Sequence, residues 1–181
     1  GSELAPEHPL VKAGTPLHGP NQFPTVEGFR ESILAFMELV TRAGHALLEG
    51  IALSLGLPDS YFSAQCTTDP LILFRIFNYP SQALPAELAP DADAIWGVGE
   101  HTDYGLLTIL AHDGTPGLQV RGSAGWLDVP AVPEAFVVNL GDMLDRMTQG
   151  RYRSTPHRVR HAAAGEGDRL SFPFFFDPDW D

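Results

Sequence analysis

The apolar pattern of the chain has two periods, and the change falls close to residue 70. Between residues 25 and 56, large apolar residues recur every three or four positions, the spacing of one helical face. Thr25 is the expected N-cap, and the pattern stops near Gly56 and Pro58. The apolar positions are Phe29, Ile33, Phe36, Val40, Ala43, Leu47 and Ile51. We therefore predict one long amphipathic helix of about 40–45 Å, followed by a short helix over residues 61–64 capped by Asp59 or Ser60.

From residue 70 onward the apolar residues alternate with a period of two, and β-branched and aromatic residues cluster between turn signals. The first predicted strand covers residues 71–79, with Leu71, Leu73, Arg75, Phe77 and Tyr79 on one face. Further strands are predicted over residues 94–100, 106–111, 117–121, 126–129, 135–140, 155–161 and 169–176. Turns or loops are predicted over residues 80–93, 112–117, 121–125 and 162–168, and a single helical turn over residues 141–146.

Eight short strands without long helices between them favour two packed antiparallel sheets over a parallel α/β sheet. The predicted fold class is mainly β with flanking α: a double-stranded β-helix, or jelly roll, of about eight strands buttressed by the long helix. We divide the chain into an extended lead-in over residues 1–24, buttressing helices over residues 25–66, and a jelly-roll core over residues 70–181.

Composition narrows the classes of partner. The 23 acidic residues outnumber the 11 Lys and Arg residues, which gives a net charge of −12. That balance argues against a nucleic-acid or anionic-membrane surface, and no apolar run approaches the ~18 residues of a membrane span. The single cysteine, Cys66, excludes an internal disulfide framework and suits a reducing compartment, so we expect a cytoplasmic protein in which Cys66 packs as a small apolar side chain.

Candidate chemistry begins with His101 and Asp103. In an extended strand, residues two positions apart share a face, so this imidazole and carboxylate are expected to meet one ion. A third ligand would complete the two-His-one-carboxylate triad used by non-haem iron(II) oxygenases. The pair alone is weak evidence, because a chain of this composition can contain such a spacing by chance.

His157 is the best third ligand, because Pro156 favours an extended backbone before it and the next residues alternate as a strand. On spacing alone, a metal-binding and a structural role are equally supported for His157. The other candidates are disfavoured: His112 is expected in a turn beside Asp113, and His161 at an exposed strand end. The remaining histidines lie in the lead-in or on the long helix (His8, His18 and His45).

A second candidate site lies at the start of the last strand, where Arg169 and Ser171 share a face and Leu170 points the other way. A guanidinium fork beside a hydroxyl matches a carboxylate. Tyr79, at the end of the first strand, is expected to add a second hydroxyl. The alternatives are that Arg169 pairs with Glu166 or Asp168, and that Tyr79 only packs.

Together these motifs resemble the 2-oxoglutarate/iron(II)-dependent dioxygenases of the isopenicillin N synthase-like family. Five segments carry the resemblance in order: Phe77-Asn78-Tyr79-Pro80, Gly99-Glu100-His101-Thr102-Asp103, Val138-Asn139-Leu140-Gly141-Asp142, residues 150–159 with Pro156-His157-Arg158-Val159, and Arg169-Leu170-Ser171-Phe172-Pro173. Phe77 departs from the pattern, because many relatives have Asn there. The family also has further chain before and after these segments, so we expect this sequence to be a fragment of a longer enzyme.

The resemblance implies an oxidoreductase. His101, Asp103 and His157 would bind Fe(II), while Arg169, Ser171 and Tyr79 would bind the co-substrate 2-oxoglutarate. With O2, such an enzyme oxidises a small-molecule substrate and releases succinate and CO2. No catalytic residue beyond the metal ligands is expected, and the sequence defines neither the substrate nor the oligomeric state. The alternatives are a 2-oxoglutarate-independent iron(II) oxidase of the same fold, and a metal-holding jelly-roll module without turnover.

Overall fold

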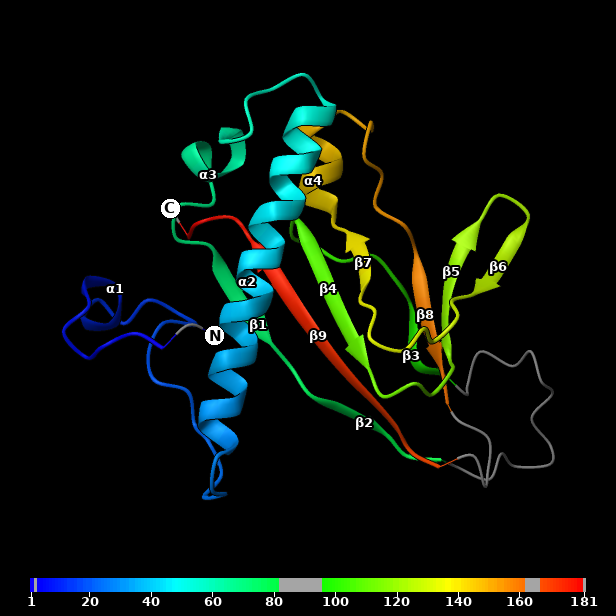
Figure 1. The fold of residues 1–181 in the computed structure, drawn as a ribbon, viewed down its shortest axis with the longest axis horizontal. Helices are drawn as coiled ribbons and strands as arrows, with labels where there is room; N and C mark the ends of the chain where they lie inside the picture. The colour runs from blue at the N-terminus through cyan, green and yellow to red at the C-terminus, as the bar shows by residue number, and fades with distance from the viewer. Residues whose placement is uncertain (2, 82–95, 162–166, 181) are drawn as a thin grey trace. The chain divides into compact units, whose positions relative to one another are not determined.

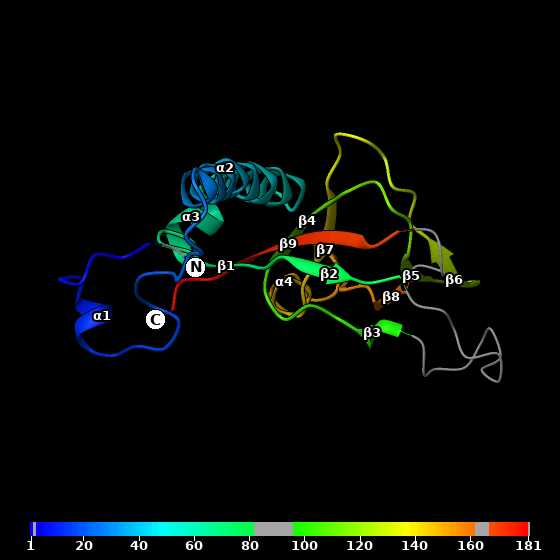
Figure 2. The same ribbon diagram turned by 90° about the horizontal axis from the view of Figure 1, so that it is seen from below.

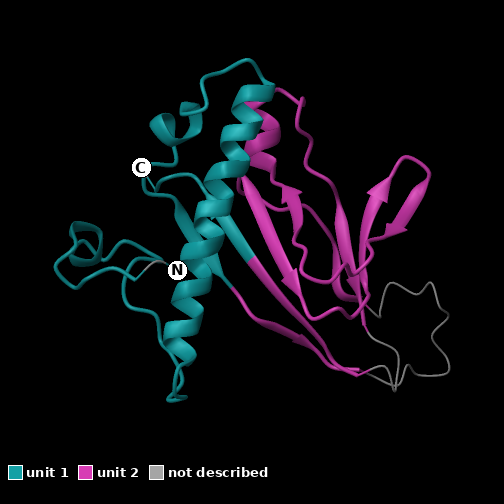
Figure 3. Ribbon diagram, viewed as in Figure 1, with its two compact units in different colours: residues 1–74, 174–181 teal, residues 75–173 magenta. Residues whose placement is uncertain are grey.

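The computed structural model describes residues 1, 3–81, 96–161 and 167–180, and it divides into two compact units. The first unit contains residues 1–74 and 174–181, and the second contains residues 75–173 (Figure 3). Each unit is described by itself. None of the helices in the described part of the chain is long and apolar enough to cross a membrane.

The first unit is built around the long helix α2 (Phe29–Ser54), which has 26 residues (Figure 1). The predicted helix is therefore confirmed, but its predicted N-cap is wrong. Gly28 is the N-cap, with φ 70°, a left-handed conformation that glycine adopts without a Cβ penalty. The short helix α3 (Tyr61–Gln65) follows as predicted. The lead-in is not wholly extended, because helix α1 (Pro9–Lys12) lies within it, with the side chain of His8 accepting the N–H of Leu10.

Helix α2 packs its buried face on aromatic residues of the same unit. Its buried residues are Met37, Val40, Gly44, Leu48, Ile51 and Ala52. The buried face is thus turned slightly from the predicted one, and Leu47 is 37% exposed. At Gly44 the ring of Phe176 lies so close that an added Cβ would come within 2.5 Å of it. His45 packs edge-on against the same ring, with centroids 5.0 Å apart, which places this histidine at the edge of the core.

The predicted strand over residues 71–79 is in fact two strands, β1 (Leu71–Phe74) and β2 (Phe77–Tyr79). Strand β1 pairs antiparallel with the end of β9 (Arg169–Asp177) in the first unit, and β2 pairs with the start of β9 in the second. The register with β9 continues unchanged from β1 to β2, and the N–H of Arg75 still donates to the carbonyl of Pro173 over 3.1 Å, but Pro173 has no N–H to return. The predicted single buried face is wrong, because Ile72 and Tyr79, an odd number of residues apart, are both buried.

The second unit consists of strands from two antiparallel sheets (Figures 1 and 2). One sheet includes β2, the start of β9, β4 (Leu107–His112) and β7 (Val137–Leu140). The other has the order β3-β8-β5-β6, from β3 (Trp96–His101), β8 (His157–Arg160), β5 (Leu118–Gly122) and β6 (Gly125–Asp128). Helix α4 (Asp142–Met147) follows β7, where a helical turn was predicted.

The core of the second unit lies between these sheets. Tyr79, Leu110, Leu118 and Val159 come from four different strands and form one buried cluster. This arrangement confirms the predicted mainly β, jelly-roll fold class. Strand limits agree within about two residues. Residues 82–93 of one predicted loop, residues 94 and 95 of one predicted strand and residues 162–166 of one predicted turn lie outside the described residues. His112 was predicted in a turn, but β4 continues through it.

Candidate functional site

His101 and His157 face each other across neighbouring strands of one sheet. They are direct partners in the antiparallel register of β3 and β8. Opposed residues in such a ladder have Cβ atoms about 5 Å apart, and here the imidazole centroids lie 4.2 Å apart. His157 is 6% exposed, whereas the His101 side chain is 38% exposed. The pair therefore has one buried wall and one accessible side.

Asp103 completes a three-residue cluster with these histidines. Its Oδ1 lies 4.0 Å from Nε2 of His101, and its Oδ2 lies 3.7 Å from Nε2 of His157. One ligand atom from each of the three residues lies within 4.8 Å of the other two. Among the described residues, this is the group that brings His, Cys or acidic side chains close enough together to hold a metal ion.

Backbone carbonyls set the orientation of both imidazoles. Nδ1 of His101 donates to the carbonyl of Gly99 over 2.8 Å, and Nδ1 of His157 donates to the carbonyl of Thr155 over 3.1 Å. Because a carbonyl only accepts, the hydrogen of each neutral ring is on Nδ1 and the lone pair is on Nε2. Both Nε2 atoms are therefore prepared to bind a cation, as the outer hydrogen bonds of metal-bound histidines commonly arrange.

The start of helix α4 holds the segment that carries Asp103. The N–H of Asp142 donates to the Asp103 carbonyl over 2.8 Å, and the Thr102 hydroxyl donates to the Asp142 carboxylate over 3.1 Å. Gly141 lies against the backbone of Gly105 so closely that a Cβ would overlap it. The sequence motif over residues 138–142 thus acts on the site through the backbone, as a support for Asp103.

The ligand atoms of His101, Asp103 and His157 fit a divalent metal that binds both nitrogen and oxygen ligands. Oδ2 of Asp103 is buried and has no hydrogen-bond partner in the described part of the chain. Leaving a buried carboxylate oxygen unpaired costs free energy unless a cation compensates it. Two neutral imidazoles and one carboxylate are the ligand set of the non-haem iron(II) facial triad. These residues are therefore suited to hold iron(II).

Arg169 is a buried cation whose donors are only partly used. The residue is 2% exposed, its Nε donates to the carbonyl of Thr115 over 3.3 Å, and its Nη1 has no partner among the described residues. Burial lowers the pKa of Arg169, although the nearby Tyr79 and Asp113 oppose that shift. Arg169 makes no ion pair with any residue that the structure describes. Asp168 accepts instead from the Asn78 side chain and the Ser81 N–H, and Glu166 lies outside the described residues.

Tyr79 and Ser171 lie beside Arg169 on two paired strands. Tyr79 is the direct register partner of Arg169, and Phe77 that of Ser171. The guanidinium carbon of Arg169 is 5.4 Å from the centre of the Tyr79 ring. Burial raises the pKa of Tyr79, with the Arg169 charge acting in the opposite direction, so its hydroxyl remains protonated as a donor at neutral pH. Ser171 is 4% exposed and Leu170 is 37% exposed, the alternation that the sequence predicted.

Comparison with known proteins identifies the family of the chain. Residues 71–178 match the family model of the 2OG-Fe(II) oxygenase superfamily. The chain belongs to this superfamily. A probable iron/ascorbate oxidoreductase of Dictyostelium discoideum is 53% identical over 99% of this chain and 54% of its own length. A 1-aminocyclopropane-1-carboxylate oxidase of the same organism is 38% identical over 84% of the chain and 48% of its own length.

A solved structure from the superfamily has a similar backbone. The crystal structure of a putative 2OG-Fe(II) oxygenase family protein from Caulobacter crescentus has a TM-score of 0.82 at 27% identity, covering 100% of this chain and 56% of its own. The chain thus spans about half the length of the proteins it matches. Membership of the superfamily agrees with the resemblance derived from the sequence motifs.

Asp113 supports the Arg169 site, a role that was not predicted from the sequence. Its carboxylate accepts the N–H of Leu170 over 2.6 Å and that of Thr115 over 2.9 Å. Burial of Asp113 opposes ionisation, but these two N–H donors and the Arg169 charge hold the pKa of this carboxyl below its usual value. Asp113 therefore ties the turn that carries the Thr115 carbonyl to the start of β9. The available signal was the Asx turn from Asp113 to Thr115.

Proposed function

We propose that this chain carries the iron(II) and 2-oxoglutarate sites of an oxygenase that oxidises a small molecule. The observation that carries the proposal is the proximity of His101, Asp103 and His157, whose ligand atoms lie within 4.8 Å of one another. The buried Arg169, from the same unit, supplies a carboxylate site of the kind that a dicarboxylic co-substrate needs. We place the catalytic core in the jelly-roll segment, residues 70–181.

His101, Asp103 and His157 would hold the iron. In His101 and His157, Nδ1 is hydrogen-bonded to a backbone carbonyl, so the lone pair of Nε2 is available to the cation. Bound iron(II), with 2-oxoglutarate and dioxygen, would supply the chemistry that oxidises a substrate C–H bond with release of succinate and CO2. The protein contributes position and shielding from water. The Asp103 carboxylate neutralises one of the two charges of the metal, and the 38% exposed side chain of His101 marks the accessible side of the centre.

Arg169, Ser171 and Tyr79 would bind the C5 carboxylate of 2-oxoglutarate. The guanidinium offers Nη1, a donor without a partner among the described residues, and the two neighbouring residues offer hydroxyl groups. A charged, desolvated fork of this kind forms stronger hydrogen bonds than a neutral donor does. The role of these three side chains is therefore to orient the co-substrate, and no proton transfer is assigned to them.

Succinate formation tests the proposal. The purified protein, given iron(II), ascorbate and 2-oxoglutarate, is expected to release succinate, and a substrate screen is expected to increase the rate. Under anaerobic conditions, iron(II) with 2-oxoglutarate should give a visible charge-transfer band. Bound iron without that band and without succinate would contradict the proposal and favour a metal-holding module.

A second candidate is an oxidase of the same fold that does not consume 2-oxoglutarate. The similarity to a protein named 1-aminocyclopropane-1-carboxylate oxidase favours including it. Oxygen uptake that is independent of 2-oxoglutarate would select this candidate. The cytoplasmic location expected from the single cysteine remains a prediction.

A further inference from the structure

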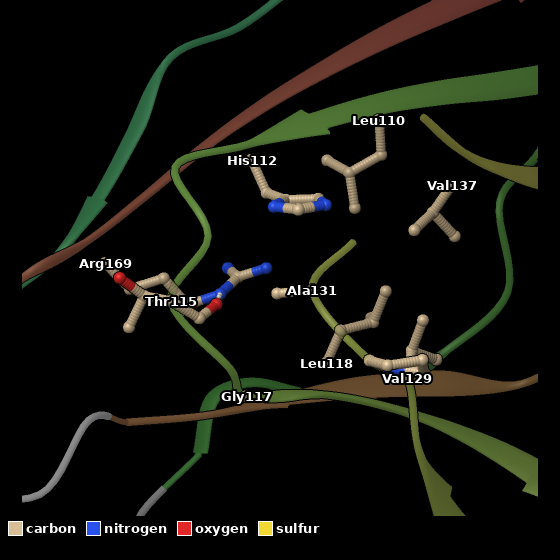
Figure 4. A pocket seen from close by; sticks show the side chains of 10 residues that line it. Leu110, His112, Thr115, Gly117, Leu118, Val129, Ala131, Val137 and Arg169 are labelled. Carbon is tan, nitrogen blue, oxygen red and sulfur yellow. Dashed lines mark hydrogen bonds between the residues drawn. The ribbon is translucent and has the colours of Figure 1, made fainter. Parts of the chain in front are cut away.

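A small pocket extends from Arg169 into the interior of the second unit. Leu110, Leu118, Val129 and Val137 give it apolar walls, and the side chains of Arg169 and His112 reach into it (Figure 4). The walls come from several strands, but the polar groups come from the end of β4 and the start of β9. Polar groups at one end of a small apolar pocket suit the charged end of a ligand.

Arg169 presents one donor to this pocket. Its Nε is already used by the carbonyl of Thr115, whereas Nη1 is buried and has no partner among the described residues. A buried guanidinium N–H without an acceptor is costly. A ligand that supplies a hydrogen-bond acceptor to Nη1 of Arg169 would therefore be stabilised in this pocket.

His112 is a second donor in the same pocket. It lies two residues after Leu110 on β4, so both side chains are on the interior face of the sheet. The N–H of Gly114 donates to Nδ1 of His112 over 3.1 Å. Because Nδ1 accepts, the hydrogen of the neutral ring is on Nε2, which is then a donor. In Figure 4 the imidazole lies close to the guanidinium within the pocket.

The nearest carboxylate does not use these donors. Both oxygens of Asp113 accept backbone N–H groups, one from Leu170 and one from Thr115. The pocket thus combines one positive charge, one neutral donor and apolar walls. That combination of donors complements a singly charged carboxylate.

We propose that His112 donates through Nε2 to the distal carboxylate of the 2-oxo acid co-substrate, beside Arg169. The proposal rests on the proposed function, and it adds to it a residue that determines affinity for a dicarboxylic over a monocarboxylic co-substrate. In the alternative, His112 only stabilises its turn by accepting from Gly114. The two roles differ in what they predict for a ligand that lacks the distal carboxylate.

The test compares 2-oxoglutarate with 2-oxopentanoate, which has the same carbon chain without the distal carboxylate. Binding to the metal-loaded protein is measured by calorimetry without oxygen. His112→Leu is expected to weaken 2-oxoglutarate about ten- to a hundredfold, the loss of one donor to a charged group. The affinity for 2-oxopentanoate should change less than about twofold, since no donor is lost to a ligand without the carboxylate. His112→Gln, which keeps a donor, should recover most of the loss, and His18→Leu should alter neither affinity.

Two results would overturn the role of His112 while leaving the proposed function intact. One is an unchanged affinity for 2-oxoglutarate in His112→Leu, and the other is an equal loss for both ligands, which would indicate a structural role. The unsubstituted protein is titrated first. If it binds iron but not 2-oxoglutarate, the 2-oxoglutarate-dependent function itself is contradicted, and the His112 proposal is overturned with it.

Discussion

Oδ2 of Asp103 lies 3.7 Å from Nε2 of His157, and both residues are more than nine-tenths buried. The distance is too long for a hydrogen bond. Nδ1 of His157 already carries the ring hydrogen, so a lone pair of nitrogen and a carboxylate oxygen face each other. In the apoprotein this contact contributes little to the stability of the fold. A cation between Oδ2 of Asp103 and Nε2 of His157 would accept a lone pair from each atom.

The first prediction follows from that contact. Asp103→Asn should weaken iron(II) binding more than about a hundredfold, because the only charged ligand is lost. In the presence of a chelator, the same substitution should raise the free energy of unfolding by about 1 kcal/mol, because the amide can donate to the Nε2 lone pair of His157. Iron titration and urea unfolding measure the two effects. Asp128→Asn, at an exposed carboxylate, is the control; iron affinity retained in Asp103→Asn would contradict the assignment.

The second prediction separates the co-substrate site from the metal site. Arg169→Ala should weaken 2-oxoglutarate more than about a hundredfold while iron affinity changes less than about threefold, because Arg169 is not part of the metal cluster. Arg169→Lys should recover only part of the loss, since an ammonium lacks the planar fork. Arg160→Ala, at an exposed arginine of β8, is the matched control. Equal losses of iron and 2-oxoglutarate in Arg169→Ala would mean that the fold, and not the site, had been damaged.

Strand alternation explains why the sequence predicted the site residues together. His101 with Asp103, and Arg169 with Ser171, are pairs two residues apart, and the period of a strand places each pair on one face. Local pattern did not predict the break at Arg75 and Ile76, because it arises opposite Pro173 of β9, a residue without an N–H that lies nearly a hundred residues later in the chain. The same limit applies to Asp113, whose partner Leu170 is 57 residues away.

His112 shows a different limit of the sequence. Turn residues follow it directly, so local composition placed it in the turn, whereas the pairing of β4 extends the strand through it. One additional strand residue changes the predicted direction of the side chain from solvent to the interior. The error at the start of helix α2 has a different cause: Gly28, and not Thr25, is the N-cap, in a left-handed conformation that favours glycine.

The third prediction concerns acid. The pKa of Asp113 is lowered in the folded protein, so its ionised form stabilises the fold above the unfolded pKa of about 3.9, and this contribution is lost as pH falls through the folded pKa. Asp113→Asn should therefore lower the free energy of unfolding at pH 7, by about 1 kcal/mol for one lost N–H acceptor. The difference from the unsubstituted protein should begin to shrink below about pH 4 and vanish as pH falls through the lower folded pKa, where both side chains are neutral.

Urea unfolding of the apoprotein at pH 7 and pH 3 measures this difference. The same variant should bind 2-oxoglutarate more weakly, because the turn that carries the Thr115 carbonyl, the acceptor for Arg169, is less well held. A stability difference that is equal at both pH values would show that the charge of Asp113 plays no part.

The fourth prediction uses two glycines of the same helix. Gly44 and Gly50 both lie within α2, where replacing glycine by alanine ordinarily stabilises a helix by about 1 kcal/mol. Nothing lies within 4 Å of a Cβ added at Gly50, so Gly50→Ala should show this gain. At Gly44 the added Cβ would come within 2.5 Å of the Phe176 ring, so Gly44→Ala should instead destabilise the protein by about 1–3 kcal/mol. Thermal and urea unfolding of both variants provide the comparison, and a gain of stability in Gly44→Ala would show that α2 does not pack on Phe176 at this distance.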